Sequence, residues 1–161
     1  MAARSDAAPI LVCTIPKAGT HLLERVVRLL PGVEPAGIHI EQFVLLEGRR
    51  PALFREISLA GLAPSVARIG PGRFATGHLL FSQPLADLLI DGGVRVLFIL
   101  RDPRDIAVSY SYYVGQLESH YLYDDYRDRD MGGRLMTTIL GINDRPLCDS
   151  SPSPPRLMDI G

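Results

Sequence analysis

One stretch of the sequence, Ile10–Leu23, constrains the fold more than any other. It begins with an apolar run that is typical of a buried strand, is interrupted at Pro16, and continues in the spacing of a helix. Gly19 allows the backbone to turn closely around a ligand just before the helix begins. This order of strand, loop and helix points backbone N–H groups and the positive end of the helix dipole at an anion. The stretch therefore favours a phosphate-binding loop between a strand and a helix.

Lys17 lies inside this loop and is the only lysine of the chain. Its ammonium group is a compact point charge of the kind that proteins use to bind phosphate. The loop is not the standard P-loop, because there the lysine follows the second glycine, whereas Lys17 precedes Gly19. Taken alone, the stretch fits an ordinary strand-to-helix turn of an α/β domain equally well.

The length of 161 residues suits one domain with a real core, and the formal net charge is −1. This charge argues against a general binder of nucleic acids or membrane surfaces, so we expect a small-molecule partner. Cys13 and Cys148 are too far apart to suggest a disulfide framework or a zinc site, and Cys13 fits a buried structural thiol. The N-terminus resembles neither a membrane span nor a good signal peptide, so we predict a cytoplasmic protein. The oligomeric state stays open.

After the loop, the pattern alternates helices with strands. We expect a short strand within residues 73–79 that ends at Gly77, and a second strand over residues 94–100. The second is apolar enough to be central and covered on both faces. Ser82 and Pro103 fit the beginnings of the helices that follow these strands. Such alternation predicts an α/β fold of three layers, with a parallel sheet between helices, in a P-loop-like nucleotide-binding architecture.

The pattern is weaker over residues 33–72. Within it, residues 38–46 fit a strand or a short helix, and residues 51–62 fit a helix that begins near Pro51. Nearer the C-terminus, residues 134–142 fit a further helix.

Three polar groups follow directly after predicted strands, namely the Lys17 loop, His78 and Arg101. Because the carboxyl ends of parallel strands meet at one edge of a sheet, we expect these groups to lie together. The guanidinium of Arg101 and the hydroxyl of Ser109 can bind a second phosphate. Alternatively, the charged residues around Arg101 only cap a helix and form surface ion pairs.

Two motifs together resemble the sulfotransferases that use 3′-phosphoadenosine 5′-phosphosulfate (PAPS). They are PKAGTHLL at residues 16–23 and LRDPRDIAVSYSYY at residues 100–113. The resemblance implies transfer of a sulfuryl group from PAPS to a hydroxyl or amine of a small acceptor. It leads us to expect one sulfotransferase-like domain over residues 1–161.

The resemblance also implies roles for single residues. Lys17 and His78 would be catalytic, Lys17 on the leaving oxygen and His78 as the base that takes the acceptor's proton. Arg101 and Ser109 would hold the 3′-phosphate of the donor. The loop around the 5′-phosphosulfate would consist of Lys17, Ala18, Gly19, Thr20 and His21.

The surroundings of His78 depart from the family, in which the histidine stands in a T-H-L context, whereas here Gly77 separates Thr76 from His78. The pair of His39 and Glu41 is the alternative base if His78 points away. This scheme uses no metal, and we expect none.

Familiar members of the family are longer and carry a later basic segment that closes over the donor. We find no clear equivalent, so we expect a fragment or a divergent short form with weak affinity for the donor. Two other functions stay open, a P-loop-type nucleotide kinase or hydrolase and a non-catalytic nucleotide-binding fragment. The position of Lys17 argues against the first, and the short length favours the second.

Overall fold

The computed structural model describes residues 7–46 and 53–141 of the chain. Their contacts divide the chain into two compact units, one within residues 1–43 and 57–101 and the other within residues 44–56 and 102–161. The first unit is an α/β sheet unit, and the second is mainly helical. The single domain that we expect over residues 1–161 therefore stays a prediction.

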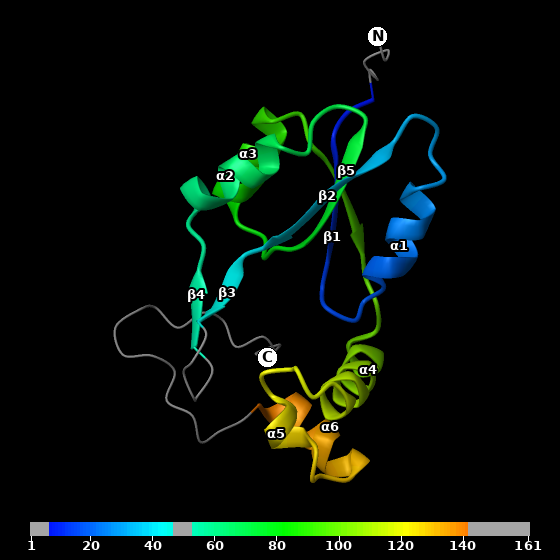
Figure 1. Ribbon diagram of the computed structural model, residues 1–161, viewed down its shortest axis with the longest axis vertical. Coiled ribbons are helices and arrows are strands. Elements are labelled where there is room, and N and C mark those ends of the chain that lie inside the picture. Colours follow the sequence, from blue (N-terminus) through cyan, green and yellow to red (C-terminus); the bar gives the residue numbers. More distant parts are fainter. Residues whose placement is uncertain (1–6, 47–52, 142–161) are drawn as a thin grey trace. The chain divides into compact units, whose positions relative to one another are not determined.

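The sheet unit has four strands, β1 (Ile10–Thr14), β2 (Glu34–Glu41), β5 (Arg73–His78) and β6 (Arg95–Ile99). Their order is β2-β5-β1-β6, and all three pairings are parallel (Figure 1). β1 lies between β5 and β6, and each of its residues is buried. Its apolar run suits this place, because a strand that is covered on both faces hides every side chain.

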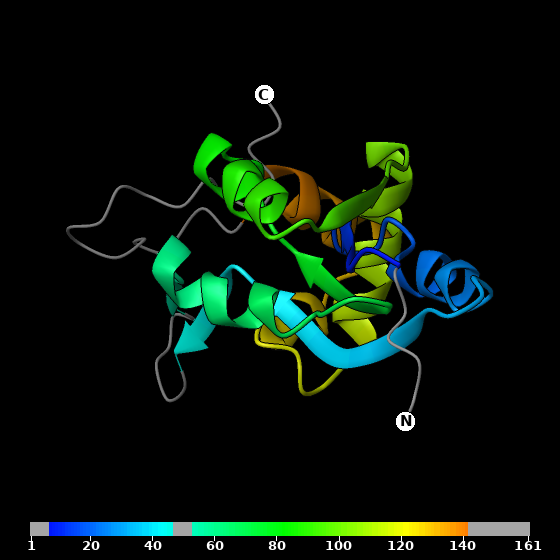
Figure 2. The same ribbon diagram turned by 90° about the horizontal axis from the view of Figure 1, so that it is seen from above.

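Helices cover both faces of this sheet (Figure 2). They are α1 (Thr20–Val27), α2 (Leu59–Ala67) and α3 (Gln83–Asp91). Leu11 and Cys13 of β1 pack with α2 and α3, whereas Ile10 and Val12 pack with α1 on the opposite face. The predicted α/β fold with three layers is confirmed, and so is the buried thiol of Cys13.

The beginning of α3 also confirms a prediction. Ser82 is its N-cap residue, and the hydroxyl of Ser82 accepts a hydrogen bond from the Leu85 N–H at 3.3 Å. The predicted helix after the loop is α1, and its apolar side chains are only partly buried. Val27 is 1% exposed, but Leu22 and Val26 are 62% and 50% exposed.

The prediction that residues 94–100 form a central strand covered on both faces is wrong. Among the described residues β6 pairs with β1 alone and stands at the edge of the sheet. Val96 and Phe98 are exposed on it. A β-branched apolar run indicates a strand, but the order of strands depends on pairing with segments far away in the sequence.

The prediction of one helix over residues 51–62 is also wrong. β4 (Leu53–Glu56) comes first, and α2 begins only after Ser58, whose hydroxyl accepts a hydrogen bond from the Gly61 N–H at 3.3 Å. This serine cap sets the start of the helix. Pro51 lies outside the described residues. Of the two alternatives for residues 38–46, the strand is confirmed, by β2 and β3 (Phe43–Leu46).

The helical unit contains α4 (Pro103–Gln116), α5 (Tyr123–Tyr126) and α6 (Met131–Leu140), and β3 and β4 form a two-stranded sheet. Pro103 begins α4 as predicted. The helix expected over residues 134–142 exists, but it begins earlier, because the Asp130 carboxylate accepts a hydrogen bond from the Gly133 N–H at 2.7 Å. Residue 142 lies outside the described part of the chain.

Buried hydroxyl groups connect the three helices of this unit. Thr138 Oγ1 of α6 lies 2.7 Å from Ser111 Oγ of α4 and 3.0 Å from Tyr126 Oη of α5. Ser111 Oγ also donates to the Ala107 carbonyl at 2.8 Å. Because buried polar groups need partners, this network favours one packing of the three helices.

The glycine that precedes His78 has a structural reason. A Cβ at Gly77 would lie 2.7 Å from the carbonyl oxygen of Ile40 in β2, which is closer than real Cβ contacts. Gly77 also pairs with Cys13 of β1. Its missing side chain therefore lets β2 approach β5 on one side while β1 holds β5 on the other.

We expect Gly77→Ala to lower the free energy of unfolding by about 1–3 kcal/mol, because the new methyl group forces the backbones of β2 and β5 apart. Urea unfolding of the two proteins measures the difference. Gly132→Ala in α6 is the control, since its Cβ would meet nothing closer than Asp130 Oδ1 at 3.7 Å. It should leave stability unchanged or raise it slightly. Equal stability of Gly77→Ala and the wild type would contradict the close contact.

Candidate functional site

The loop between β1 and α1 makes a tight turn, as the sequence predicts. The Ala18 N–H donates to the Ile15 carbonyl at 3.0 Å, and Lys17 and Gly19 have positive φ angles of 67° and 122°. Glycine adopts such angles readily, but lysine does so rarely. Ala18 is buried and anchors the loop. The backbone is therefore held in an unusual conformation at the predicted anion loop.

The N-terminus of α1 lacks a side-chain cap. Gly19 is its N-cap residue and provides no such hydrogen bond. The other described helices of eight or more residues are capped by Ser58, Ser82, Asp102 and Asp130. N–H groups at a helix start, together with the helix dipole, favour an anion. This end of α1 can therefore bind a negatively charged ligand.

Arg101 reaches the loop from beyond the end of β6. Its Nη1 donates to the Lys17 carbonyl oxygen at 3.0 Å. Thr14 pairs with Ile99, so β1 and β6 end at the same level of the sheet. Lys17 and Arg101 therefore meet beyond the carboxyl ends of these two strands. This part of the predicted convergence is confirmed. Ser109 is half-buried in α4 of the other unit, so its pairing with Arg101 stays a prediction.

The surface ion pair that we considered as an alternative also exists. Arg104 Nη2 lies 2.6 Å from Asp102 Oδ2, and Asp102 caps α4 by accepting from the Arg104 N–H at 2.9 Å. These contacts with Arg104 lower the pKa of the Asp102 carboxyl to about 2. Asp102 thus has a capping role, whereas Arg101 contacts the loop.

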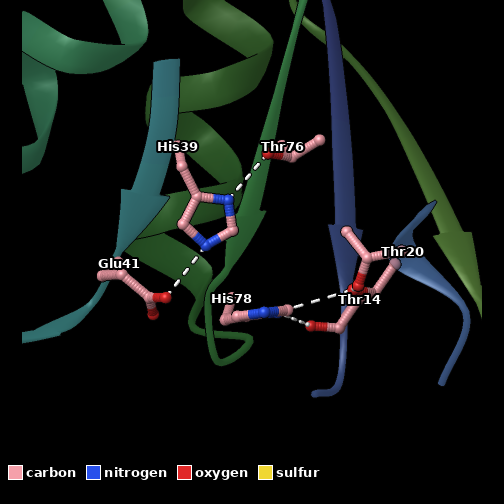
Figure 3. Close-up of polar contacts among 6 residues, drawn as sticks. All are labelled: Thr14, Thr20, His39, Glu41, Thr76 and His78. Carbon is pink, nitrogen blue, oxygen red and sulfur yellow. Dashed lines mark hydrogen bonds and ion pairs between the residues drawn. The ribbon is translucent and has the colours of Figure 1, made fainter. Parts of the chain in front are cut away.

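His78 ends β5 and is held by the neighbouring strand β1. Its Nδ1 lies 2.7 Å from the Thr14 carbonyl oxygen (Figure 3). A carbonyl oxygen only accepts, so Nδ1 carries the proton, and Nε2 of the neutral ring has the lone pair. Thr14 Oγ1 lies 2.5 Å from Thr20 Oγ1 at the start of α1. Thr14 therefore connects the predicted base to the anion loop.

His39 and Glu41 on β2 lie beside His78, as Figure 3 shows. The two imidazole rings meet edge to face, with their centroids 5.0 Å apart. His39 Nδ1 lies 2.7 Å from Thr76 Oγ1, and His39 Nε2 lies 2.9 Å from Glu41 Oε1. The hydrogen bond to the Glu41 carboxylate raises the pKa of His39. The two alternative bases of the sequence analysis thus occupy one cluster.

Some contacts of the site were missed in the sequence. No role is predicted for Thr14 from the sequence, and its polarity at the strand end is the signal that could have found it. Gln42 was also missed. The side-chain Oε1 of Gln42 accepts a hydrogen bond from the Leu80 N–H at 2.6 Å. The backbone N–H of Gln42 donates to the His78 carbonyl at 3.4 Å. Both residues fix the backbone around His78.

His21 follows Thr20 in the first turn of α1, and its side chain is 96% exposed. Its Nδ1 lies 3.7 Å from Glu24 Oε2, within the same helix. The structure brings the backbone of His21 to the loop but gives its side chain a surface contact. Contact between His21 and the donor stays a prediction.

The sheet unit thus has an α/β fold in which the predicted anion loop and the cluster of His39, Glu41 and His78 lie at the carboxyl ends of parallel strands. The family model of the sulfotransferase domain matches residues 7–139, so the chain belongs to the sulfotransferase domain family. Membership supports sulfuryl transfer as the general chemistry and a small molecule as the acceptor. Comparisons with curated proteins and with solved structures give no match. Among the described helices, none has the length and apolarity that crossing a membrane requires.

We expect neutral His78 to carry its proton on Nδ1, because the Thr14 carbonyl accepts it. His120 is the matched control, since its Nδ1 accepts from the Leu122 N–H at 3.2 Å and its proton must then lie on Nε2. Long-range proton–nitrogen NMR correlations, recorded at a pH where both rings are neutral, distinguish the two tautomers. Protonation of His78 on Nε2 would contradict the hydrogen bond to Thr14.

Proposed function

We propose that this domain transfers a sulfuryl group from PAPS to a hydroxyl or amine of a small acceptor. One observation carries the proposal. In a chain of the sulfotransferase family, the Lys17 loop, Arg101 and His78 lie at the same edge of the sheet.

The part of the site around Lys17, Arg101 and the start of α1 suits the phosphosulfate of the donor. The start of α1 has no side-chain cap, and the bond from Arg101 to the Lys17 carbonyl holds two basic residues beside it. The 5′-phosphosulfate would contact the loop from Lys17 to His21. The 3′-phosphate would contact Arg101 and Ser109. These assignments follow the family resemblance.

Transfer breaks the bond between sulfur and the bridging oxygen of the donor, and it forms a bond from sulfur to the acceptor's oxygen or nitrogen. Negative charge grows on the bridging oxygen, where the Lys17 ammonium stabilises it. Nε2 of His78 takes the acceptor's proton, because Nδ1 already donates to Thr14. 3′,5′-Adenosine bisphosphate leaves with the electron pair of the broken bond. The scheme needs no metal.

We expect Lys17→Ala to lower kcat/KM by about 10²–10³-fold through the loss of charge stabilisation. His78→Gln should lower it by about 10²–10⁴-fold through the loss of the base. The measurement is PAPS-dependent sulfation of a panel of phenols, alcohols and amines. Arg95→Ala is the control, because it removes a cation at the other end of β6, and it should retain activity. Wild-type activity in both site variants would contradict the roles.

Binding of 3′,5′-adenosine bisphosphate separates recognition of the donor from catalysis. In isothermal titration, Lys17→Ala and Arg101→Gln should each weaken binding by about 10-fold, as expected when a hydrogen-bonded charge is removed from an anion. His78→Gln should bind like the wild type. Binding without transfer to any acceptor would favour the non-catalytic alternative, and magnesium-dependent turnover of ATP would favour a kinase or hydrolase.

The cytoplasmic location stays a prediction.

A further inference from the structure

Side chains that commonly bind metals lie close together at the β2 side of the site. His39, Glu41 and His78 each offer one ligand atom, and these atoms lie within 4.8 Å of one another. The parallel pairing of β2 with β5 sets this distance, because Glu41 stands opposite His78 and His39 opposite Thr76. We propose that His39, Glu41 and His78 bind a divalent transition metal ion, for which Zn²⁺ is the probe.

Both imidazole rings are held in the way that ligating histidines usually are. His78 Nδ1 donates to the Thr14 carbonyl, and His39 Nδ1 lies 2.7 Å from the Thr76 hydroxyl. In metal sites, the second ring nitrogen generally donates to a fixed oxygen, which leaves the other nitrogen for the metal. Nε2 is therefore the ligand atom of each ring.

The carboxylate is already next to one of these atoms. Glu41 Oε1 accepts a hydrogen bond from His39 Nε2 at 2.9 Å. A metal ion replaces that proton on Nε2, and the ring then carries its proton on Nδ1, where the Thr76 hydroxyl can accept it. Zinc bonds of about 2.0–2.1 Å put ligand atoms roughly 3.4 Å apart, so the most distant pair of ligand atoms must approach by up to about 1.4 Å. The side chains of His39 and Glu41 are 41% and 48% exposed, which leaves them room for this movement.

The ligand set favours some metals over others. Two imidazoles and one carboxylate are a common set for zinc with an open fourth position, which water can fill. Mg²⁺ and Ca²⁺ prefer sites made of oxygen ligands, and only one of these three groups supplies oxygen. The cluster therefore selects a transition metal.

The site goes beyond the proposed transfer and does not rest on it. A metal ion on Nε2 of His78 uses the lone pair that would otherwise take the acceptor's proton. Metal binding and transfer therefore exclude each other at this atom, and zinc inhibits the proposed reaction.

The test is a titration of the full chain with Zn²⁺ against a chromogenic chelator. We expect one bound ion per chain, and a loss of affinity of about 10-fold or more in His39→Ala and in Glu41→Gln. Thr76→Val, which removes the acceptor of His39 Nδ1, should weaken binding by about 10–100-fold. His120→Asn is the control for histidines outside the cluster and should bind zinc like the wild type.

Thermal unfolding in the presence of EDTA shows whether the variants fold. Glu41→Gln keeps the shape of its side chain and decides the question if His39→Ala does not fold. Wild-type zinc affinity in folded Glu41→Gln or Thr76→Val overturns the proposal, and so does the lack of a stoichiometric complex. The two proposals fail separately, because zinc binding needs no donor and binding of 3′,5′-adenosine bisphosphate needs no zinc.

Discussion

The close contact between β2 and β5 at Gly77 is the constraint on which the rest of the site depends. The Ile40 carbonyl lies where a side chain at Gly77 would stand, so the two backbones touch at this point. That contact brings Glu41 opposite His78 and His39 opposite Thr76. A glycine that looks like a departure from the family motif is therefore what positions the histidine cluster.

Thr14 makes the second connection, between the histidine cluster and the anion loop. Its carbonyl accepts from His78 Nδ1, and its hydroxyl meets the Thr20 hydroxyl at the start of α1. Both atoms belong to the end of a fully buried strand, so the sheet itself fixes them. The tautomer of His78 and the start of α1 thus depend on the same residue.

Local signals in the sequence predict much of this arrangement. The apolar run before Pro16, the turn at Gly19, the cap at Ser82 and the helix start at Pro103 each depend on a few neighbouring residues, and the structure has them as expected. The contact between the Lys17 loop and Arg101 also follows, since it needs only parallel strands with aligned ends.

Other features of the fold depend on contacts between segments far apart in the chain, and the sequence of each segment alone does not predict these features. The edge position of β6 reflects which strands are its neighbours, and its composition could not reveal that. The strand that precedes Ser58 belongs to a separate two-stranded sheet. His39 and His78 looked like rival bases because the register of β2 against β5, which places them side by side, is not encoded in either segment alone.

The order of the strands gives the site two electrostatically different ends. Arg101 and the Lys17 loop lie at the β6 and β1 side, whereas Glu41 and His39 lie at the β2 side, with His78 between them. An anion is favoured at the first end and a proton or a metal cation at the second. His78 lies between these two ends, and its Nδ1 donates to the Thr14 carbonyl, which leaves the lone pair on Nε2. Under the two proposals, the acceptor's proton and a metal ion therefore compete for the same nitrogen of His78.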